Sequence, residues 1–187
     1  MSIFVLTKSE KKFLLGLTRK IIFAHANNII WNKEKIFSKS LNVSSGVFVT
    51  LHKNSQLRGC IGYVEGIMPV QRAVEEMAVA AAFDDPRFPA VDKAEIDDID
   101  IEISVLSTLQ TIKEIGEIIV GKHGLIIEQN LRRGLLLPQV AMEYEWDTVT
   151  FLEQTCQKAG LTSSAWQEES TKIQIFSAEI FSENDFR

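Results

Sequence analysis

Residues 46–62 read GVFVTLHKNSQLRGCIG, and this stretch decides the fold. Apolar residues occupy every second position from Val47 to Leu51, which is the period of a half-buried strand. The odd-numbered apolar positions resume after the turn residues 54–56 and continue to Ile61. We therefore predict a β-hairpin with a three-residue loop.

The register of this hairpin follows from the same pattern. Opposite residues in an antiparallel pair have a constant index sum, and the two apolar faces coincide only when that sum is even. A sum of 110 fits a three-residue loop. In this register Thr50 faces Cys60, and His52 faces Arg58 on the same face of the hairpin.

Helical spacing predicts one helix on each side of the hairpin. A capping-box pattern over residues 7–10 opens the first helix, which we expect to end near residues 27–28. Pro69 suits the first turn of a second helix that runs to the Asp-Asp-Pro break at 84–86. Strict alternation over residues 99–105 then predicts a strand.

The order hairpin, helix, strand recurs later in the chain. The segment from Gly124 resembles the one from Gly46, and Gly134 corresponds to Gly59. A helix from about Asp147 and a final alternating strand over residues 173–180 complete the second copy. We predict an α+β fold in which two diverged ββαβ repeats form a largely antiparallel sheet with flanking helices. The predicted single domain, 1–187, divides into an N-terminal helical segment (1–45), a first repeat (46–110) and a second repeat (120–182).

Composition narrows the class of protein. The 187 residues are 45% hydrophobic and can close a core, which excludes a disordered chain, a collagen-like chain and a bare coiled coil. No apolar run approaches the roughly 20 residues that cross a bilayer, so we expect a soluble cytoplasmic protein. Two cysteines and three scattered histidines give neither a disulfide framework nor metal-ligand spacing. We therefore expect no metal site, and since phosphate-binding and dinucleotide-binding loops are also missing, we expect no cofactor.

Charge is unevenly distributed along the chain. The first 60 residues carry ten Lys and Arg against two acidic residues, a local charge of +8, and the remainder carries ten against twenty-three, −13. The asymmetry indicates either a face that attracts an anionic partner or a basic segment that packs against an acidic one.

The candidate site is Cys60 with its neighbours. Glycines within a strand mark a bulge or a close approach, and Gly59 and Gly62 flank this cysteine. In the second repeat, the positions that correspond to residues 60–62 are three leucines, 135–137. Cys60 and Gly62 are therefore the specialised positions. Cys60 is either a nucleophile activated by His52 and Arg58 or a small buried apolar residue. Cys156, at helical spacing in an apolar segment, belongs to the core.

Two further groups are candidates for ligand or partner binding. Asp85 and Arg87 follow the second predicted helix, where a carboxylate can do acid/base work or hold a loop by pairing with arginine. Arg133 can bind an anion through forked hydrogen bonds or simply lie on a hairpin turn.

The chain resembles the AMMECR family. The hallmark hexapeptide of that family matches residues 57–62, and the resemblance covers roughly residues 7 to 182 in one order. Further matching segments are Ala80 to Phe88, Ile101 to Ser107, Arg133 to Val140 and Cys156 to Leu161.

The resemblance implies a duplicated α+β unit with a barrel-like sheet, but no established activity. Bacterial and archaeal members are called protein A of the AmmeMemoRadiSam system, which implies a Memo-like protein and a radical SAM enzyme as partners. Three hypotheses follow. The chain is a binding or adaptor module with a cleft around residues 57–62, which also suits a small anionic ligand; or an enzyme that uses Cys60; or an RNA-associated factor that uses the basic segment.

The charge asymmetry generates a first prediction. We expect at most weak RNA binding, because the basic residues form no dense tract interleaved with aromatic residues. Affinity should fall steeply between about 50 and 200 mM salt, since phosphate contacts release counterions. Fluorescence polarisation with a labelled RNA measures this. Submicromolar binding at physiological salt would contradict it.

Overall fold

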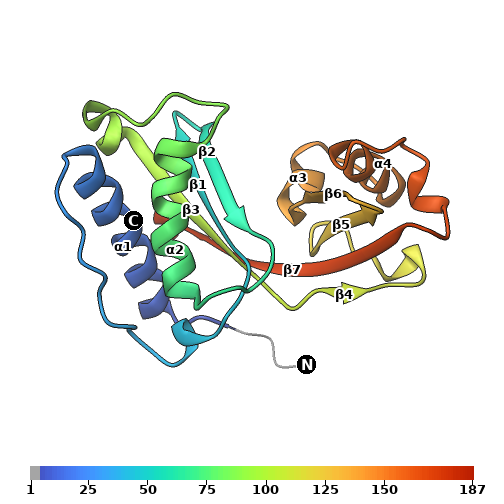
Figure 1. Ribbon diagram of the computed structural model, residues 1–187, viewed down its shortest axis with the longest axis horizontal. Helices are drawn as coiled ribbons and strands as arrows, with labels where there is room; N and C mark the ends of the chain where they lie inside the picture. The colour runs from blue at the N-terminus through green and yellow to red at the C-terminus, as the bar shows by residue number, and fades with distance from the viewer. Residues whose placement is uncertain (1–4) are drawn as a thin grey trace. The chain divides into compact units, whose positions relative to one another are not determined.

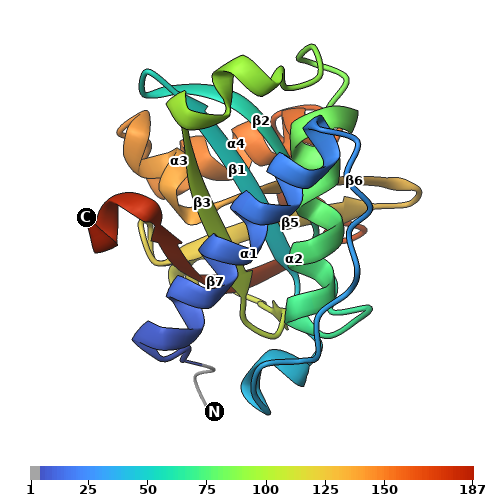
Figure 2. The same ribbon diagram turned by 90° about the vertical axis from the view of Figure 1, so that its left-hand side faces the viewer.

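The predicted hairpin is present, and a third strand pairs with it. In the computed structural model, which describes residues 5–187, β1 (Val47–Lys53) lies between β2 (Gln56–Tyr63) and β3 (Ile99–Leu106). Both pairings are antiparallel. Figure 1 and Figure 2 show α1 (Lys8–Ala26) and α2 (Val70–Val79) against one face of this sheet. Val47, Val49 and Leu51 of β1 form the core with these helices and with the odd-numbered side chains of β3.

The chain divides into two units. The first unit contains the residues up to Leu106 and resumes at Glu179–Arg187, and the second unit is Ser107–Ala178. In chain order the second unit is thus inserted into the first. Strand β7 (Lys172–Ser182) begins in the second unit and ends in the first.

The predicted register is right at Thr50 and wrong at His52. Thr50 pairs with Cys60 as expected, but His52 pairs with Leu57 rather than Arg58. The turn contains only Asn54 and Ser55, both with positive φ, so Lys53 pairs with Gln56. This shorter turn gives an odd index sum, and a bulge that leaves Arg58 unpaired restores the even sum beyond it.

Both predicted helices of the first unit are confirmed. Thr7 and Glu10 form the capping box of α1, and the helix ends at Ala26. α2 begins directly after Pro69 and continues into a π-helical turn, η2 (Ala80–Asp84), that the sequence pattern did not indicate. The short 3-10 helices of the first unit are η1 (Ser40–Asn42), η3 (Lys93–Asp98) and η6 (Glu183–Phe186).

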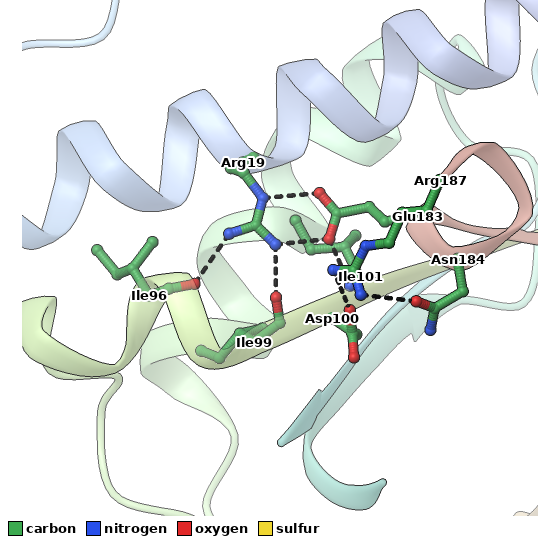
Figure 3. A network of polar contacts seen from close by, with 8 residues as sticks. All are labelled: Arg19, Ile96, Ile99, Asp100, Ile101, Glu183, Asn184 and Arg187. Atoms are coloured by element: carbon green, nitrogen blue, oxygen red, sulfur yellow. Dashed lines mark hydrogen bonds and ion pairs between the residues drawn. The ribbon is translucent and has the colours of Figure 1, made fainter. Parts of the chain in front are cut away.

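An ion-pair network, drawn in Figure 3, holds the last residues of the chain against the rest of the first unit. Arg19 on α1 donates from Nε and Nη2 to the carboxylate of Glu183, at 2.7 and 2.5 Å. Its Nη1 and Nη2 also donate to the carbonyl oxygens of Ile96 and Ile99. The Ile101 amide donates to Glu183 as well, so one carboxylate joins α1, β3 and η6.

The basic N-terminal segment forms ion pairs with acidic residues from later in the chain. Lys11 pairs with Glu179, and Lys53 and Arg58 both pair with Glu95. These ion pairs favour the hypothesis that the basic segment packs against acidic groups over the hypothesis of a nucleic-acid face.

The second unit repeats the order of the first. Strand β5 (His123–Gln129) lies between β6 (Arg132–Leu136) and β7, again with antiparallel pairing. The predicted helix is α4 (Thr148–Lys158), and Cys156 on it is fully buried, as expected. The duplication itself stays a prediction, because a shared order of elements does not establish it. The unit's other elements are β4 (Gln110–Thr111), η4 (Ile115–Glu117), α3 (Pro138–Glu143) and η5 (Ala165–Gln167).

Gly59 lets the end of the second helix reach the sheet. A Cβ atom at Gly59 would lie 2.1 Å from the carbonyl oxygen of Ala81 in η2. Gly134 has the same role in the second unit, where a Cβ atom would lie 2.4 Å from the amide nitrogen of Ala159. Gly59 and Gly134, which occupy corresponding positions in the two predicted repeats, thus both leave room for helix backbone.

This close approach generates a second prediction. Gly59→Ala should lower the free energy of unfolding by about 2 kcal/mol, because backbone must shift to admit the methyl group. Gly16→Ala is the matched control: a Cβ atom there has no neighbour within 4 Å, and the change should stabilise α1 by about 1 kcal/mol. Chemical denaturation of both variants measures this. Equal effects would contradict the close approach.

Candidate functional site

The candidate site is centred on Cys60, at the edge of the first unit's sheet. β2 is the terminal strand in the order β2, β1, β3, so one edge of it has no strand partner in this sheet. Gly62, two residues on, faces the ring of Phe48: a Cβ atom there would lie 2.3 Å from that ring. Gly59 and Gly62 thus permit contacts on either side of Cys60 that a side chain would block.

Asp85 and Arg87 bind both main-chain polar groups of Cys60. The Cys60 amide donates to Oδ2 of Asp85 at 2.9 Å, and Nη2 of Arg87 donates to the Cys60 carbonyl oxygen at 3.0 Å. Arg87 also donates to Asp85 from Nε and Nη2, at 2.9 and 2.7 Å. We call this group, Cys60 with Asp85 and Arg87, the Cys60 clamp. It replaces the strand partner that an edge strand lacks.

Local sequence places Asp85 at this position. The π-helical turn η2 follows α2 and lies against Gly59, and it ends at Asp84 immediately before the clamp. Asp85 has extended backbone, as expected for a residue that precedes a proline. Its side chain also accepts from the Arg87 amide at 3.1 Å, a turn typical of aspartate.

The electrostatics of the clamp favour an ionised Asp85. Hydrogen bonds from Arg87 lower the pKa of Asp85, burial opposes this change, and the hydrogen bond from the Cys60 amide adds to it. The pKa of Arg87 is raised by the same pairing. Asp85 is 4% exposed, so its charge is buried but neutralised by a fixed partner.

The surroundings of Cys60 raise the pKa of its thiol. Burial raises the pKa of Cys60, while a hydrogen bond from the Thr50 hydroxyl, 3.4 Å from Sγ, and the charge of Arg87 oppose this rise. The carboxylates of Asp85 and Glu102 raise the pKa further. The thiol is therefore protonated at neutral pH, and a protonated thiol is a poor nucleophile.

The pairing expected to activate Cys60, His52 with Arg58, does not form. The bulge directs Arg58 to Glu95, 2.6 Å away, and to the carbonyl oxygens of Pro89 and Ala90. This pairing lowers the pKa of Glu95 to about 2. His52 lines a cavity of about 240 Å³ together with Asp100 and Glu102. The hypothesis that His52 and Arg58 face each other beside Cys60 is therefore wrong.

Other predicted residues have separate places. Arg133 lies on β6 in the second unit, opposite Glu128, with 4.0 Å between the charged groups. The sequence did not single out Thr50 or Glu95 as site residues. The predicted pairing of Thr50 with Cys60 was the available signal for the first, and a capping-box spacing from Asp92 was the signal for the second.

These features define an α+β protein with two antiparallel units and a clamped cysteine strand. The sequence model of the AMMECR1 family matches residues 15–181, and the chain belongs to that family. A solved structure of an uncharacterised Pyrococcus horikoshii protein matches with a TM-score of 0.91 and 39% identity, over 95% of this chain and 93% of that chain. This match and the antiparallel pairings confirm the predicted fold class.

Two relatives match most of the chain, and neither name states an activity. A Caldivirga maquilingensis protein is 41% identical over 93% of this chain and 85% of its own length. A Methanocaldococcus jannaschii protein is 41% identical over 96% and 92%. Among residues 5–187, no helix has the length and apolar character needed to span a membrane.

The thiol environment generates a third prediction. Iodoacetamide should alkylate Cys60 in the folded protein at pH 7 more slowly than a free thiol of pKa about 8.5, with a rate that keeps rising above pH 9. Thr50→Val should slow the reaction further, since it removes a hydrogen bond that lowers the pKa. Peptide mapping by mass spectrometry measures both rates. Faster alkylation than the free thiol would show an activated cysteine.

Proposed function

We propose that this chain is a cytoplasmic binding module and that the Cys60 clamp is its preformed recognition surface. The observation that carries the proposal is the fixed peptide of Cys60, held at its amide by Asp85 and at its carbonyl by Arg87. A binding surface gains affinity when it is ordered before the partner arrives, because less conformational entropy is lost on binding.

The clamp offers a specific contact to a partner. The Arg87 side chain is 49% exposed, and its Nη1 makes no hydrogen bond within residues 5–187. The guanidinium also lies over the ring of Phe88, 5.4 Å from its centroid, which orients it. An oriented arginine with an unused edge suits a carboxylate of a protein partner or a small anionic ligand.

The partners we propose are the Memo-like protein and the radical SAM enzyme that the family resemblance implies. The neutral thiol supports binding over thiol catalysis, because a nucleophilic Cys60 would need an adjacent base or cation. Arg87 is a nearby cation, but Asp85 neutralises it.

Calorimetric titration of the purified chain with each proposed partner from the same genome tests this function. We expect one partner to bind, and Arg87→Gln to weaken binding roughly tenfold or more, as for a central arginine contact. Arg187→Gln is the matched control: it also removes a surface Arg–Asp ion pair, with Asp100, and should leave affinity unchanged.

Three outcomes would contradict the proposal. Neither partner binds, or the two arginine variants behave alike, or Cys60→Ser abolishes a chemical turnover that the intact chain performs with those partners. The last outcome would establish the thiol enzyme instead. Thermal unfolding of each variant checks that the fold persists.

A further inference from the structure

A hollow on the first unit lies among α1, α2 and the segment that connects α1 to η1. Its volume is about 540 Å³, and it shares Ile29, Ile30 and Trp31 with a second hollow of about 630 Å³. Both volumes fall in the range of small-molecule sites, roughly 300 to 1,000 Å³. None of the residues of the Cys60 clamp lines either hollow. The hollow of 540 Å³ is lined by Ile21, His25, Ile29, Ile30, Trp31, Lys33, Glu75, Glu76 and Val79.

Hydrogen bonds hold the connecting segment on either side of residues 30–33. The Ile29 amide donates to the Ala24 carbonyl oxygen at 2.8 Å, and Arg72 on α2 donates to the Glu34 carbonyl oxygen at 2.7 Å. Residues 30–33 make no hydrogen bond within the described part of the chain. Figure 2 shows this segment running back along α2. The wall of the hollow can therefore adjust to a ligand without losing hydrogen bonds.

Apolar side chains are unusually exposed beside the hollow. Ile30 is 87% exposed, Ile29 is 54% exposed, and Phe23 on α1 is 52% exposed. Neighbouring exposed apolar residues at a concave site indicate a surface that binds an apolar group.

Two side chains that line the hollow carry hydrogen-bond donors without a protein partner in the part of the chain that the structure describes. Trp31 Nε1 is buried without a partner, and the Lys33 ammonium has no ion pair, among residues 5–187. A buried indole N–H without a partner is uncommon. The carboxylates at the hollow already have partners: Glu75 accepts from Arg72 at 2.6 Å, and Glu76 accepts from the Tyr63 hydroxyl at 3.1 Å.

We propose that this hollow binds an amphiphilic monocarboxylate, a molecule with an aliphatic or aromatic body and one carboxylate. The body packs on Ile21, Ile29 and Val79. The carboxylate accepts from Lys33 and from Trp31 Nε1 once the indole turns toward the hollow. Turning the indole sacrifices no hydrogen bond, since Nε1 makes none in the present packing.

Titration calorimetry with sodium decanoate, below its micellar concentration, tests the proposal on the full chain. We expect saturable binding of one decanoate per chain, with decanol weaker and decylamine weakest. Lys33→Gln should weaken decanoate binding about 3-fold, as for an exposed ion pair. Trp31→Phe should weaken it roughly 2- to 10-fold, because it removes the N–H and keeps the apolar ring.

Two further variants separate this site from non-specific binding. Lys35→Gln removes a nearby exposed lysine that does not line the hollow, and it should leave affinity unchanged. Ile30→Asp changes a residue too exposed to affect folding, and it should weaken decanoate binding. The proposal is overturned by no saturable binding, by equal losses in the Lys33 and Lys35 variants, or by preference for decylamine. Concentration-dependent self-association blocked by Ile30→Asp, without decanoate binding, would identify a protein interface instead.

Discussion

The hydrogen bond from the Cys60 amide to the Asp85 carboxylate is the interaction on which the candidate site depends. An edge strand exposes main-chain groups that must find partners, and here one buried carboxylate supplies the acceptor while Arg87 supplies the donor. The Asp85 pKa is lowered in the folded chain, so the clamp contributes stability above the unfolded-state pKa of about 3.9. That contribution is lost as pH falls toward the folded-state pKa. The clamp is therefore fully formed at neutral pH.

The clamp in turn requires a glycine beneath it. Gly59 lets η2 lie directly on β2, and this contact carries the chain that follows, including Asp85, to the strand edge. A side chain at residue 59 would move that segment outward and stretch the hydrogen bond to Cys60. Gly134 admits the end of α4 in the second unit, but the residues after that helix do not include an aspartate–arginine pair. The helix-on-glycine contact is thus common to both units, whereas the clamp belongs to the first.

Periodicity predicted most of the fold. Alternation over residues 99–105 identified β3, and the capping pattern at Thr7 identified the start of α1, because both signals come from neighbouring residues. The pairing of Thr50 with Cys60 followed from the even index sum. The prediction for His52 was wrong because the turn is one residue shorter than expected and the bulge adds one residue back. The two changes cancel, so the apolar pattern beyond the bulge is the same with or without them. A bulge that preserves the pattern leaves no trace in periodicity, yet it removed Arg58 from the predicted site.

The clamp could be only partly predicted. Asp85 and Arg87 were candidates from their position after a helix, but their contact with Cys60 depends on a π-helical turn and a backbone approach that spacing does not encode. Amide hydrogen exchange of Cys60 in the native protein and in Asp85→Asn tests the central claim most directly. A clamped amide should exchange slowly although its strand lies at a sheet edge, and Asp85→Asn should accelerate exchange at Cys60 more than at Leu51. Fast exchange of Cys60 in the unmodified protein would contradict the account.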